Sequence, residues 1–485
     1  MHTRESGMRP LCVGDLRDEI VGIDTRVPLL DGTERPYVFL DNAASTPALK
    51  GVLRAVEEFL PWYSGVHRGT GFKSILATGV FDAAHDQVGA FVGADAASST
   101  VIFTKNTTEC INKLANRIPF RPGDVVVTTM MEHHSNDLPW RKHARVVHIG
   151  ITADGHPDLP AMRAAIAREK GRLRLVAVSG ASNITGLCAP IHEIAAWAHE
   201  AGALIFVDAA QLAPHRAIDM LPDDNPGHID FLALSAHKMY APFGTGALIG
   251  PRRFFEEGEP DLVGGGVVDI VTLDRAVWNH PPHKEEAGSP NVLGGVALAA
   301  SLRILSTVGM NEIAAHEQQL LSYGYVRLKK IPKIVLYGPT DRLEEKVGVM
   351  AFNIEGMHHS LVAAILGVEG GIGVRDGCFC AHPYVKELLH VGPEEDRRFT
   401  AEVMSGNKSN MPGMVRASLG CYNTTEDIDA LAEMLERVAR GAYTGKYVQD
   451  PASGAFHAGG YNVDFARYCS LASPPAAGRV HSEAS

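Results

Sequence analysis

The chain has 485 residues, of which 45% are hydrophobic and 21% charged, so it is long enough for one large core and a second domain. Its net charge of −11 repels nucleic acid and anionic membranes, and we expect neither as a partner. Seven cysteines, an odd and sparse set, indicate reduced thiols and a cytoplasmic location rather than a disulfide framework. The sequence has no CxxC pair and no run of roughly 18–20 apolar residues, so we expect neither a structural metal nor a membrane helix.

The first part of the chain alternates between strand-like and helix-like patterns. Residues 1–36 are weakly patterned and are expected to form an N-terminal arm, and "YVFLDNAAST" (37–46) predicts a short strand that breaks into a turn. Further strands are predicted at 99–104, 124–130, 144–150, 174–180, 203–209, 231–236 and 246–250, with helices at 159–171 and 191–202. This alternation predicts a large α/β domain over 37–290, with a mainly parallel sheet wound with helices.

The pattern changes after residue 290. "GGVALAASLRILSTVG" begins a long helical region, "VGVMAFNIEG" reads as a strand, and "MVRASLGCYNTTEDIDALAEMLERVA" reads as a strand followed by a capped helix. These features predict a smaller α+β domain over 291–440. Residues 441–485 are rich in Gly, Ala, Ser and Pro and are expected to be a tail that is partly disordered in its last dozen residues.

"DFLALSAHKMYAPFGTGALIG" (230–250) is the most informative stretch for chemistry. Most lysines are solvated surface charges, but Lys238 follows an apolar strand, where a β-to-α loop meets the carboxyl edge of the predicted sheet. Open α/β sheets bind ligands at that edge. An amine placed there can form a Schiff base with an aldehyde cofactor.

Two other strand ends offer groups that suit the same cofactor. Asp208 ends an apolar strand, and a carboxylate there can stabilise the protonated pyridine nitrogen of pyridoxal phosphate (PLP). Thr107 and Thr108 stand between a strand and a helix, where free N–H groups and the helix dipole favour a phosphate. Taken alone, the aspartate is more often a helix cap, and the threonine pair is only an N-cap.

Together the motifs resemble the class V family of PLP enzymes, in its cysteine desulfurase and selenocysteine lyase branch. The resemblance runs from about Leu40 to Val438. Its motifs stand in family order: "FLDNAASTP", "VHRG", "FTKNTTECIN", "MEHHSN", "SNITG", "VDAAQLAPHR", "SAHKMYAPFGTG", "EEAGSPN", "GVRDGCFC" and "VRASLGCYNT". It implies the PLP-dependent transferase type I fold and pyridoxal 5'-phosphate as the cofactor.

The resemblance also implies roles for residues at matching positions. Lys238 would be the Schiff-base lysine and proton shuttle, Asp208 would pair with the pyridinium and Gln211 with the phenolic oxygen, and His133 would stack on the ring. The phosphate would be held by Thr107, Thr108, Ser235 and His237, with Ser289 reaching it from the other subunit of a homodimer. The substrate would be bound by Asn183, Arg375 and Arg416, with His67 and Arg68 lining the pocket. The arginine roles agree with the preference of carboxylates for a bidentate guanidinium.

The segment "EGGIGVRDGCFCAHP" (369–383) places two thiols in a flexible turn. Its glycines and Pro383 indicate a loop, and Arg375 and His382 nearby favour a thiolate. The resemblance implies that the cysteine before "AHP", Cys380, attacks the sulfur of the substrate, carries it as a persulfide and releases alanine. Cys378 departs from the usual pattern, and resolving a persulfide, helping to bind a metal and being inert all remain open for it.

The stretch 384–415 is longer than its counterpart in the usual desulfurase, and we expect it to form a helix and a lid near the pocket. If the pocket is covered, the identity of the substrate is not fixed by the resemblance. Our leading hypothesis is a C–S lyase that converts L-cysteine to alanine and an enzyme persulfide, with a protein sulfur acceptor as a further partner. The alternatives are selenocysteine lysis, β-elimination, epimerisation, and a weakly catalytic scaffold for sulfur transfer.

Overall fold

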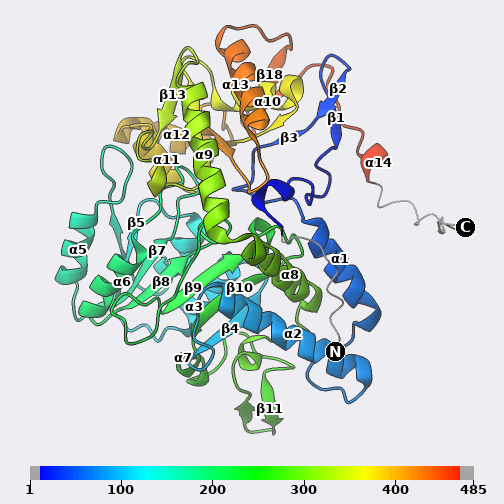
Figure 1. Cartoon of the computed structure of the whole chain (residues 1–485). Coiled ribbons are helices and arrows are strands. Elements are labelled where there is room, and N and C mark those ends of the chain that lie inside the picture. The colour runs from blue at the N-terminus through cyan, green and yellow to red at the C-terminus, as the bar shows by residue number, and fades with distance from the viewer. Residues whose placement is uncertain (1–10, 470–485) are drawn as a thin grey trace, which may run out of the picture.

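The computed structural model describes residues 11–469, so the predicted disorder of the last dozen residues lies outside the described part. A seven-stranded sheet forms its centre (Figure 1). The strands in spatial order are β4 (Ser99–Thr104), β10 (Gly246–Pro251), β9 (Phe231–Ser235), β8 (Leu204–Asp208), β7 (Leu173–Ser179), β5 (Val125–Thr129) and β6 (Arg145–Ile149). Each corresponds to a strand predicted from the sequence.

The sheet is mainly parallel, with one reversed strand. Neighbouring strands from β6 through β5, β7 and β8 to β9 pair in parallel. Strand β10 runs antiparallel to both β9 and β4. The carboxyl ends of β4, β5, β7, β8 and β9 therefore meet at one edge, where loops can converge on a ligand.

Successive side chains of the inner strands enter different cores. Ile205 and Val207 of β8 belong to the larger hydrophobic cluster, whereas Phe206 between them belongs to a smaller cluster on the other face. This alternation is the two-residue period of a strand, here with both faces covered. The covering helices are α1 (Lys50–Phe59), α2 (Phe72–Phe91), α3 (Thr107–Arg117), α4 (Leu138–Arg141), α5 (Leu159–Arg168), α6 (Ile191–Glu200), α7 (Arg252–Glu256) and α8 (Val292–Val308).

A second hydrophobic cluster lies around a four-stranded antiparallel sheet. Its strands in order are β13 (Ile334–Tyr337), β14 (Val349–Ile354), β17 (Met414–Ser418) and β16 (Arg375–Gly377). Helices α9 (Met310–Leu328), α10 (His359–Gly370) and α13 (Thr425–Ala439) pack with this sheet. Thr424 and Asp427 form the capping box that begins α13, as the sequence pattern indicated.

The packing does not divide at residue 290. Helix α8 packs on α1 and α2 in the larger cluster, although it follows that boundary. In the other direction, β3 (Val38–Phe39) pairs with β15 (Ile372–Gly373), and Val38 and Leu40 join the second cluster. The start and the middle of the chain are therefore interleaved between the two cores.

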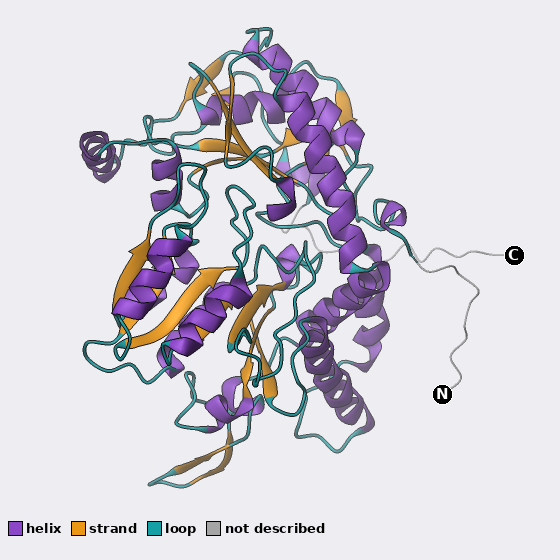
Figure 2. Cartoon of the chain, turned by 60° about the vertical axis from the view of Figure 1, so that its left-hand side comes forward, coloured by secondary structure: helices purple, strands orange, loops and turns teal. Residues whose placement is uncertain are grey.

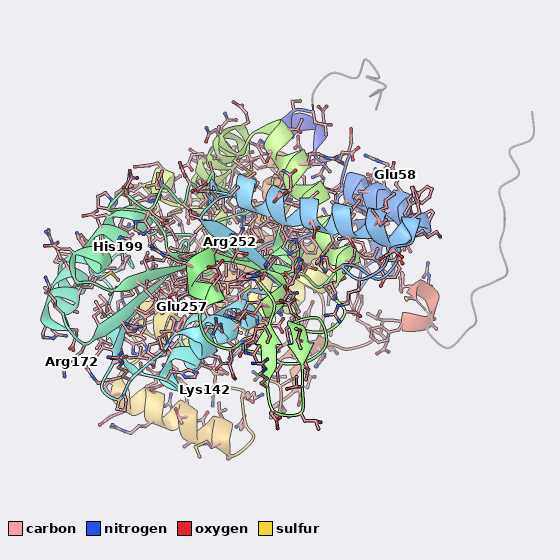
Figure 3. All side chains as sticks on the ribbon, turned by 90° about the horizontal axis from the view of Figure 1, so that it is seen from below. Glu58, Lys142, Arg172, His199, Arg252 and Glu257 are labelled. Carbon is pink, nitrogen blue, oxygen red and sulfur yellow. The ribbon has the colours of Figure 1, made fainter. Side chains whose placement is uncertain are left out.

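The remaining elements belong to neither of the two main sheets. They are the pairs β1 (Arg26–Pro28) with β2 (Glu34–Pro36), β11 (Val268–Val271) with β12 (Ala276–Trp278), and β18 (Tyr447–Gln449) with β19 (Phe456–Ala458), and the helices α11 (His382–Leu388), α12 (Pro393–Met404) and α14 (Phe465–Tyr468). Figure 2 shows the β11–β12 hairpin projecting away from the body. Seen from below, the exposed side chains of Glu58, Lys142 and Arg172 lie toward the outside of the molecule (Figure 3).

Among the described residues, no single helix is long and apolar enough to cross a membrane. The bent pair α8 and α9, with 75° between its members, passes that test of length and composition only when the two are taken together.

Candidate functional site

A cavity of about 300 Å³ opens at the carboxyl edge of the large sheet. It brings together twelve predicted site residues: Thr107, Thr108, His133, Asn183, Asp208, Gln211, Ser235, His237, Lys238, Arg375, Cys380 and Arg416. The other lining residues are Ala43, Ala44, Asn106, Ser135, Ser179, Ala181, Ala210 and Phe379. Segments from both hydrophobic cores thus meet at one pocket.

Lys238 is the central amine of the cavity. It ends the short helical turn Ala236–Lys238 that directly follows β9, and its neighbours Ala236 and Met239 are fully buried. Loss of water lowers the pKa of the Lys238 amine to about 8, while the carboxylate of Asp208 opposes this shift. About a tenth of the amine is therefore neutral at pH 7, and the neutral amine is the form that acts as nucleophile or base.

Asp208 is the last residue of β8, and Gln211 follows it by three positions. The Asp208 carboxylate accepts a hydrogen bond from the backbone N–H of Ala210 at 2.9 Å, and burial raises its pKa. The Gln211 amide nitrogen lies 3.2 Å from Nε2 of His215, whose Nδ1 lies 2.5 Å from the buried carboxylate of Glu317. Gln211 Oε1 is enclosed and has no hydrogen-bond partner among the described residues.

His133 is held by Ser135 beside the N-terminus of α3. The backbone N–H of Ser135 donates to His133 Nδ1 at 3.1 Å, so this nitrogen carries a lone pair. Burial and, secondarily, the charge of Lys238 lower the His133 pKa to about 4. The imidazole is thus a neutral flat ring at physiological pH. The Ser135 hydroxyl also lies 2.7 Å from the hydroxyl of Thr108.

The start of α3 forms the anion-attracting end of the cavity. Asn106 caps this helix, because its side chain accepts a hydrogen bond from the backbone N–H of Glu109. The Thr107 backbone N–H donates to the Ser235 hydroxyl at 2.9 Å, which ties the helix to the end of β9. His237 faces the same cavity, and burial lowers its pKa to about 4. Helix dipole and hydroxyl donors together suit a phosphate.

Two arginines from neighbouring strands share one carboxylate. Arg375 of β16 and Arg416 of β17 stand opposite each other in the antiparallel register. Asp41 lies 2.9 Å from Arg375 and 3.0 Å from Arg416. Arg416 is 2% exposed, and its Nε has no hydrogen-bond partner among the described residues, whereas the Arg375 side chain is 53% exposed. The buried guanidinium is the better placed of the two to hold a carboxylate away from water.

The cysteine loop reaches the cavity from the smaller sheet. Phe379 and Cys380 have φ values of 48° and 56°, in the left-handed region that non-glycine residues seldom adopt. Three contacts hold this backbone: His134 N–H donates to Cys380 C=O at 2.7 Å, the Asn183 amide donates to Phe379 C=O at 2.8 Å, and Arg416 lies over the Phe379 ring. The conformation presents an exposed Cys380 side chain to the cavity.

Cys378 has the opposite environment. Its thiol is buried and donates to the backbone carbonyl of Pro412 at 3.0 Å. Burial raises its pKa to about 11, so it stays protonated at neutral pH. Of the two cysteines in the turn, only Cys380 lines the cavity.

Three predicted site residues lie elsewhere in this chain. Ser289, His67 and Arg68 line a separate hollow of about 880 Å³, together with residues of α2 and the segment 265–290. The structure thus does not bring them to Lys238 within one chain.

The prediction that residues 384–415 form one helix and a lid near the pocket is wrong. Residues 384–415 contribute no side chain to the lining of the cavity, and they contain most of α11 and all of α12 instead of one helix. Tyr384 of α11 is fully buried and donates to the backbone carbonyl of Gly155. The insertion therefore packs at this point against the loop after β6, outside the site.

Sequence reasoning missed three polar residues of the site. Asp41 joins both arginines, Ser135 links His133 to Thr108, and Glu132 accepts hydrogen bonds from Thr129, Asn136 and Ser179 beneath the cavity. Burial raises the Glu132 pKa to about 7. All three lie inside the quoted motifs "FLDNAASTP" and "MEHHSN", which were the signals available.

The residues present fit pyridoxal phosphate. The unpaired Gln211 Oε1 marks a polar atom without a partner in the protein. Asp208 suits a protonated ring nitrogen, His133 a flat ring face, and the start of α3 a phosphate. Lys238, an amine of lowered pKa, suits the aldehyde of this cofactor. A site that bound only a simple anion would need neither this amine nor the residues that suit the ring.

Comparison with known proteins gave matches over most of the chain. A model of the family described as aminotransferase class-V matches residues 38–431. A probable cysteine desulfurase of Halobacterium salinarum is 36% identical over 408 residues, covering 82% of this chain and 91% of that protein. A cysteine desulfurase of Dickeya dadantii is 35% identical, with 84% and 93% covered.

Solved structures give the same picture. The apo cysteine desulfurase of Thermococcus onnurineus has a TM-score of 0.75 and 32% identity, covering 90% of this chain and 99% of that one. The cysteine desulfurase CsdA of Escherichia coli, in an S-sulfonic acid form, has a TM-score of 0.74 and 29% identity, covering 90% and 100%.

Proposed function

The chain belongs to the aminotransferase class-V family, and from this premise we propose that it is a PLP-dependent cysteine desulfurase that converts L-cysteine to L-alanine and carries the sulfur on Cys380. One observation carries the proposal: an exposed thiol and an amine of lowered pKa, Lys238, line one cavity. The names of the similar proteins support the same reaction class.

Pyridoxal phosphate would be held by Lys238, Asp208, Gln211 and His133, and by the phosphate-binding set at the start of α3. When bound, it supplies an electron sink next to the substrate Cα. The protein supplies the rest. Arg416, with Asn183 beside it, binds the substrate carboxylate, and the neutral amine of Lys238 moves the Cα proton.

Sulfur transfer is the task of the cysteine loop. The Cys380 thiolate attacks the substrate sulfur, so that an S–S bond forms while the Cβ–S bond breaks. The electron pair of the broken bond remains with the substrate, whose Cβ takes up a proton and becomes the methyl group of alanine. Cys380 is left as a persulfide, which a second thiol or a protein acceptor then removes.

A symmetric homodimer is part of the proposal. Ser289 lies in a hollow apart from the Lys238 cavity of its own chain, which supports a role at the phosphate of the partner. Sedimentation at micromolar concentration should give a dimer, and an active monomer would contradict this arrangement. A cytoplasmic location and the absence of nucleic-acid and membrane partners stay predictions.

The decisive experiment compares the two cysteines of the turn. Cys380→Ala should lower alanine formation by at least about a thousandfold, because it removes the nucleophile, while cofactor absorbance stays unchanged. Cys378→Ala, the matched control, should keep most of the turnover, since the Cys378 thiol is buried and protonated. Mass spectrometry after addition of cysteine should place the extra sulfur on Cys380.

Other products would point to other functions. Pyruvate and ammonia from a Cys380→Ala enzyme of normal rate would indicate β-elimination, and racemised substrate would indicate an epimerase. Preference for selenocysteine over cysteine would indicate the lyase. If Cys378→Ala is the inactive variant, the assignment of the nucleophile is reversed. If no amino acid is turned over, the protein would be a scaffold for sulfur transfer.

A further inference from the structure

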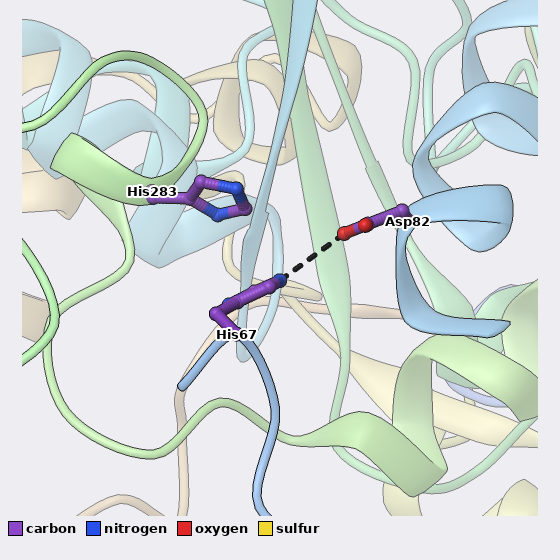
Figure 4. Close-up of side chains that lie close together, drawn as sticks. All are labelled: His67, Asp82 and His283. Atoms are coloured by element: carbon purple, nitrogen blue, oxygen red, sulfur yellow. Dashed lines mark hydrogen bonds and ion pairs between the residues drawn. The ribbon is translucent and has the colours of Figure 1, made fainter. Parts of the chain in front are cut away.

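Three metal-ligating side chains converge in the hollow that also contains Ser289. His67 lies in the loop before α2, Asp82 on α2, and His283 at the start of the short helical turn His283–Glu285 (Figure 4). One ligand atom of each lies within 4.8 Å of the others. His67 Nε2 is 3.1 Å from Asp82 Oδ1, and the two imidazole rings are 4.0 Å apart.

The same hollow contains polar atoms without partners. Nδ1 of His283 and Oε2 of Glu286 are enclosed, and neither has a hydrogen-bond partner among the described residues. The Glu286 side chain is only 4% exposed, and its other oxygen accepts from Phe103 N–H at 2.6 Å and lies 2.9 Å from His85 Nε2. Buried polar atoms are rarely left unpaired, and an ion is one of the usual reasons. Of these two residues, His283 belongs to the cluster of three ligands.

The backbone at His67 is held in an unusual conformation. Its φ of 69° lies in the left-handed region, and its N–H donates to the Thr78 hydroxyl at 2.8 Å. Such conformations in non-glycine residues concentrate at ligand-binding positions, where the surrounding structure fixes them. Here the result is an imidazole that faces Asp82.

We propose that His67, Asp82 and His283 form a binding site for a divalent transition metal of the Zn²⁺ class, with Glu286 as the neighbouring carboxylate. Two imidazoles and a carboxylate are a typical ligand set for Zn²⁺, which accepts one further ligand. The metal would take the place of the proton between His67 Nε2 and Asp82 Oδ1, and that proton would leave to solvent.

A second cluster in the chain provides an internal contrast. His199, His228 and Asp230 also lie within ligand distance of one another, with His199 on α6 (Figure 3). There, both ring nitrogens of His199 are engaged, one by the Pro226 carbonyl at 2.8 Å and the other by Asp230 at 2.9 Å. Asp230 also accepts from Ile205 N–H. That cluster is saturated by the protein and serves as the control.

The test uses the full-length protein with its cofactor, after chelation of bound metals and alkylation of exposed thiols, which bind Zn²⁺ themselves. Calorimetric titration with Zn²⁺ should show one site per chain, with a heat that depends on the buffer because a proton is released. His283→Ala and Asp82→Asn should each weaken the site at least about tenfold, since even outer partners of a metal ligand are worth about 10–100-fold. His199→Ala should bind as wild type does.

Each other outcome overturns the proposal. A hollow that contains only water would show no Zn²⁺ binding by the alkylated wild type. Unchanged affinity in both His283→Ala and Asp82→Asn would place the metal elsewhere, and loss in His199→Ala would move it to the control cluster. Circular dichroism of each variant, with two independent ligand substitutions, separates lost binding from lost folding. The readout is metal binding and requires no turnover, so it is scored separately from the proposed function, although the hollow also contains Ser289, which the homodimer proposal places at the partner's phosphate.

Discussion

Two lysines of this molecule are removed from solvent in different surroundings. Lys238 stands in the cavity at the edge of the large sheet, and Lys346 lies fully buried in the loop before β14. Burial lowers both amine pKa values, to about 8 for Lys238 and to about 7 for Lys346. The larger shift therefore belongs to the lysine outside the proposed site.

The surroundings separate the two lysines where the pKa does not. The Lys346 amine donates to the Tyr325 hydroxyl and to the Pro339 carbonyl, and it lies over the Tyr325 ring. The Lys238 amine instead faces a cavity that Asp208 and Cys380 also line. A lowered pKa thus marks burial, while an open cavity with complementary groups marks chemistry.

The largest effect is expected when each of the two lysines is replaced separately. Lys238→Ala should lower turnover by at least about a thousandfold and remove the visible absorbance of lysine-bound cofactor, because the amine is both the attachment point and the base. Lys346→Met should retain both. Spectra and alanine formation of the two purified variants give the answer. A yellow Lys238→Ala protein, or a colourless Lys346→Met protein, would reverse the comparison.

A smaller effect should separate the two arginines around Asp41. Arg416→Lys should raise KM for cysteine by about 10–100-fold, because a buried guanidinium offers a carboxylate two parallel hydrogen bonds and an ammonium does not. Arg375→Lys should change KM less than about fivefold, because its half-exposed side chain competes with water. Steady-state kinetics on both variants decide the matter. Equal effects would show that the two arginines act as one carboxylate clamp.

Local patterns were enough for the sheet and for most of the cavity. The strands of the large sheet are apolar runs bounded by turn residues, and the family resemblance, which the comparisons confirm, located Lys238 and Asp208 at their ends. The mainly parallel sheet and the type I fold are confirmed as well. The reversed direction of β10 was missed, because an apolar run has the same composition in either direction.

The features that the sequence did not predict depend on contacts between segments that are distant in the chain. Asp41 acquires its place only when β3 and β17 bring it to both arginines. The segment 384–415 does not line the cavity, and its Tyr384 contacts Gly155 and Thr185, which lie far from it in the sequence. Spacing could not distinguish a buried Cys378 from an exposed Cys380, because the difference arises from two successive left-handed residues and from the Pro412 carbonyl.

The smallest predicted effect concerns Lys346 and pH. Between its folded pKa of about 7 and its ordinary value of 10.5, the unfolded chain binds a proton that the folded chain does not. The free energy of unfolding of the wild type should therefore rise with pH across this window, by up to about 1 kcal/mol per pH unit from this group. Lys346→Met removes the group, so the difference between wild type and variant isolates its contribution from all other titrations.

Urea unfolding of both proteins at the two ends of that window measures the difference. The free energy of unfolding of the wild type should increase relative to that of Lys346→Met as the pH rises. The variant also leaves the Tyr325 hydroxyl and the Pro339 carbonyl without their partner, but that penalty is the same at both pH values. A difference that stays constant would mean that Lys346 remains charged in the folded protein. Burial would then fail to set the pKa even where the lysine is completely enclosed, and the contrast with Lys238 would rest on the cavity alone.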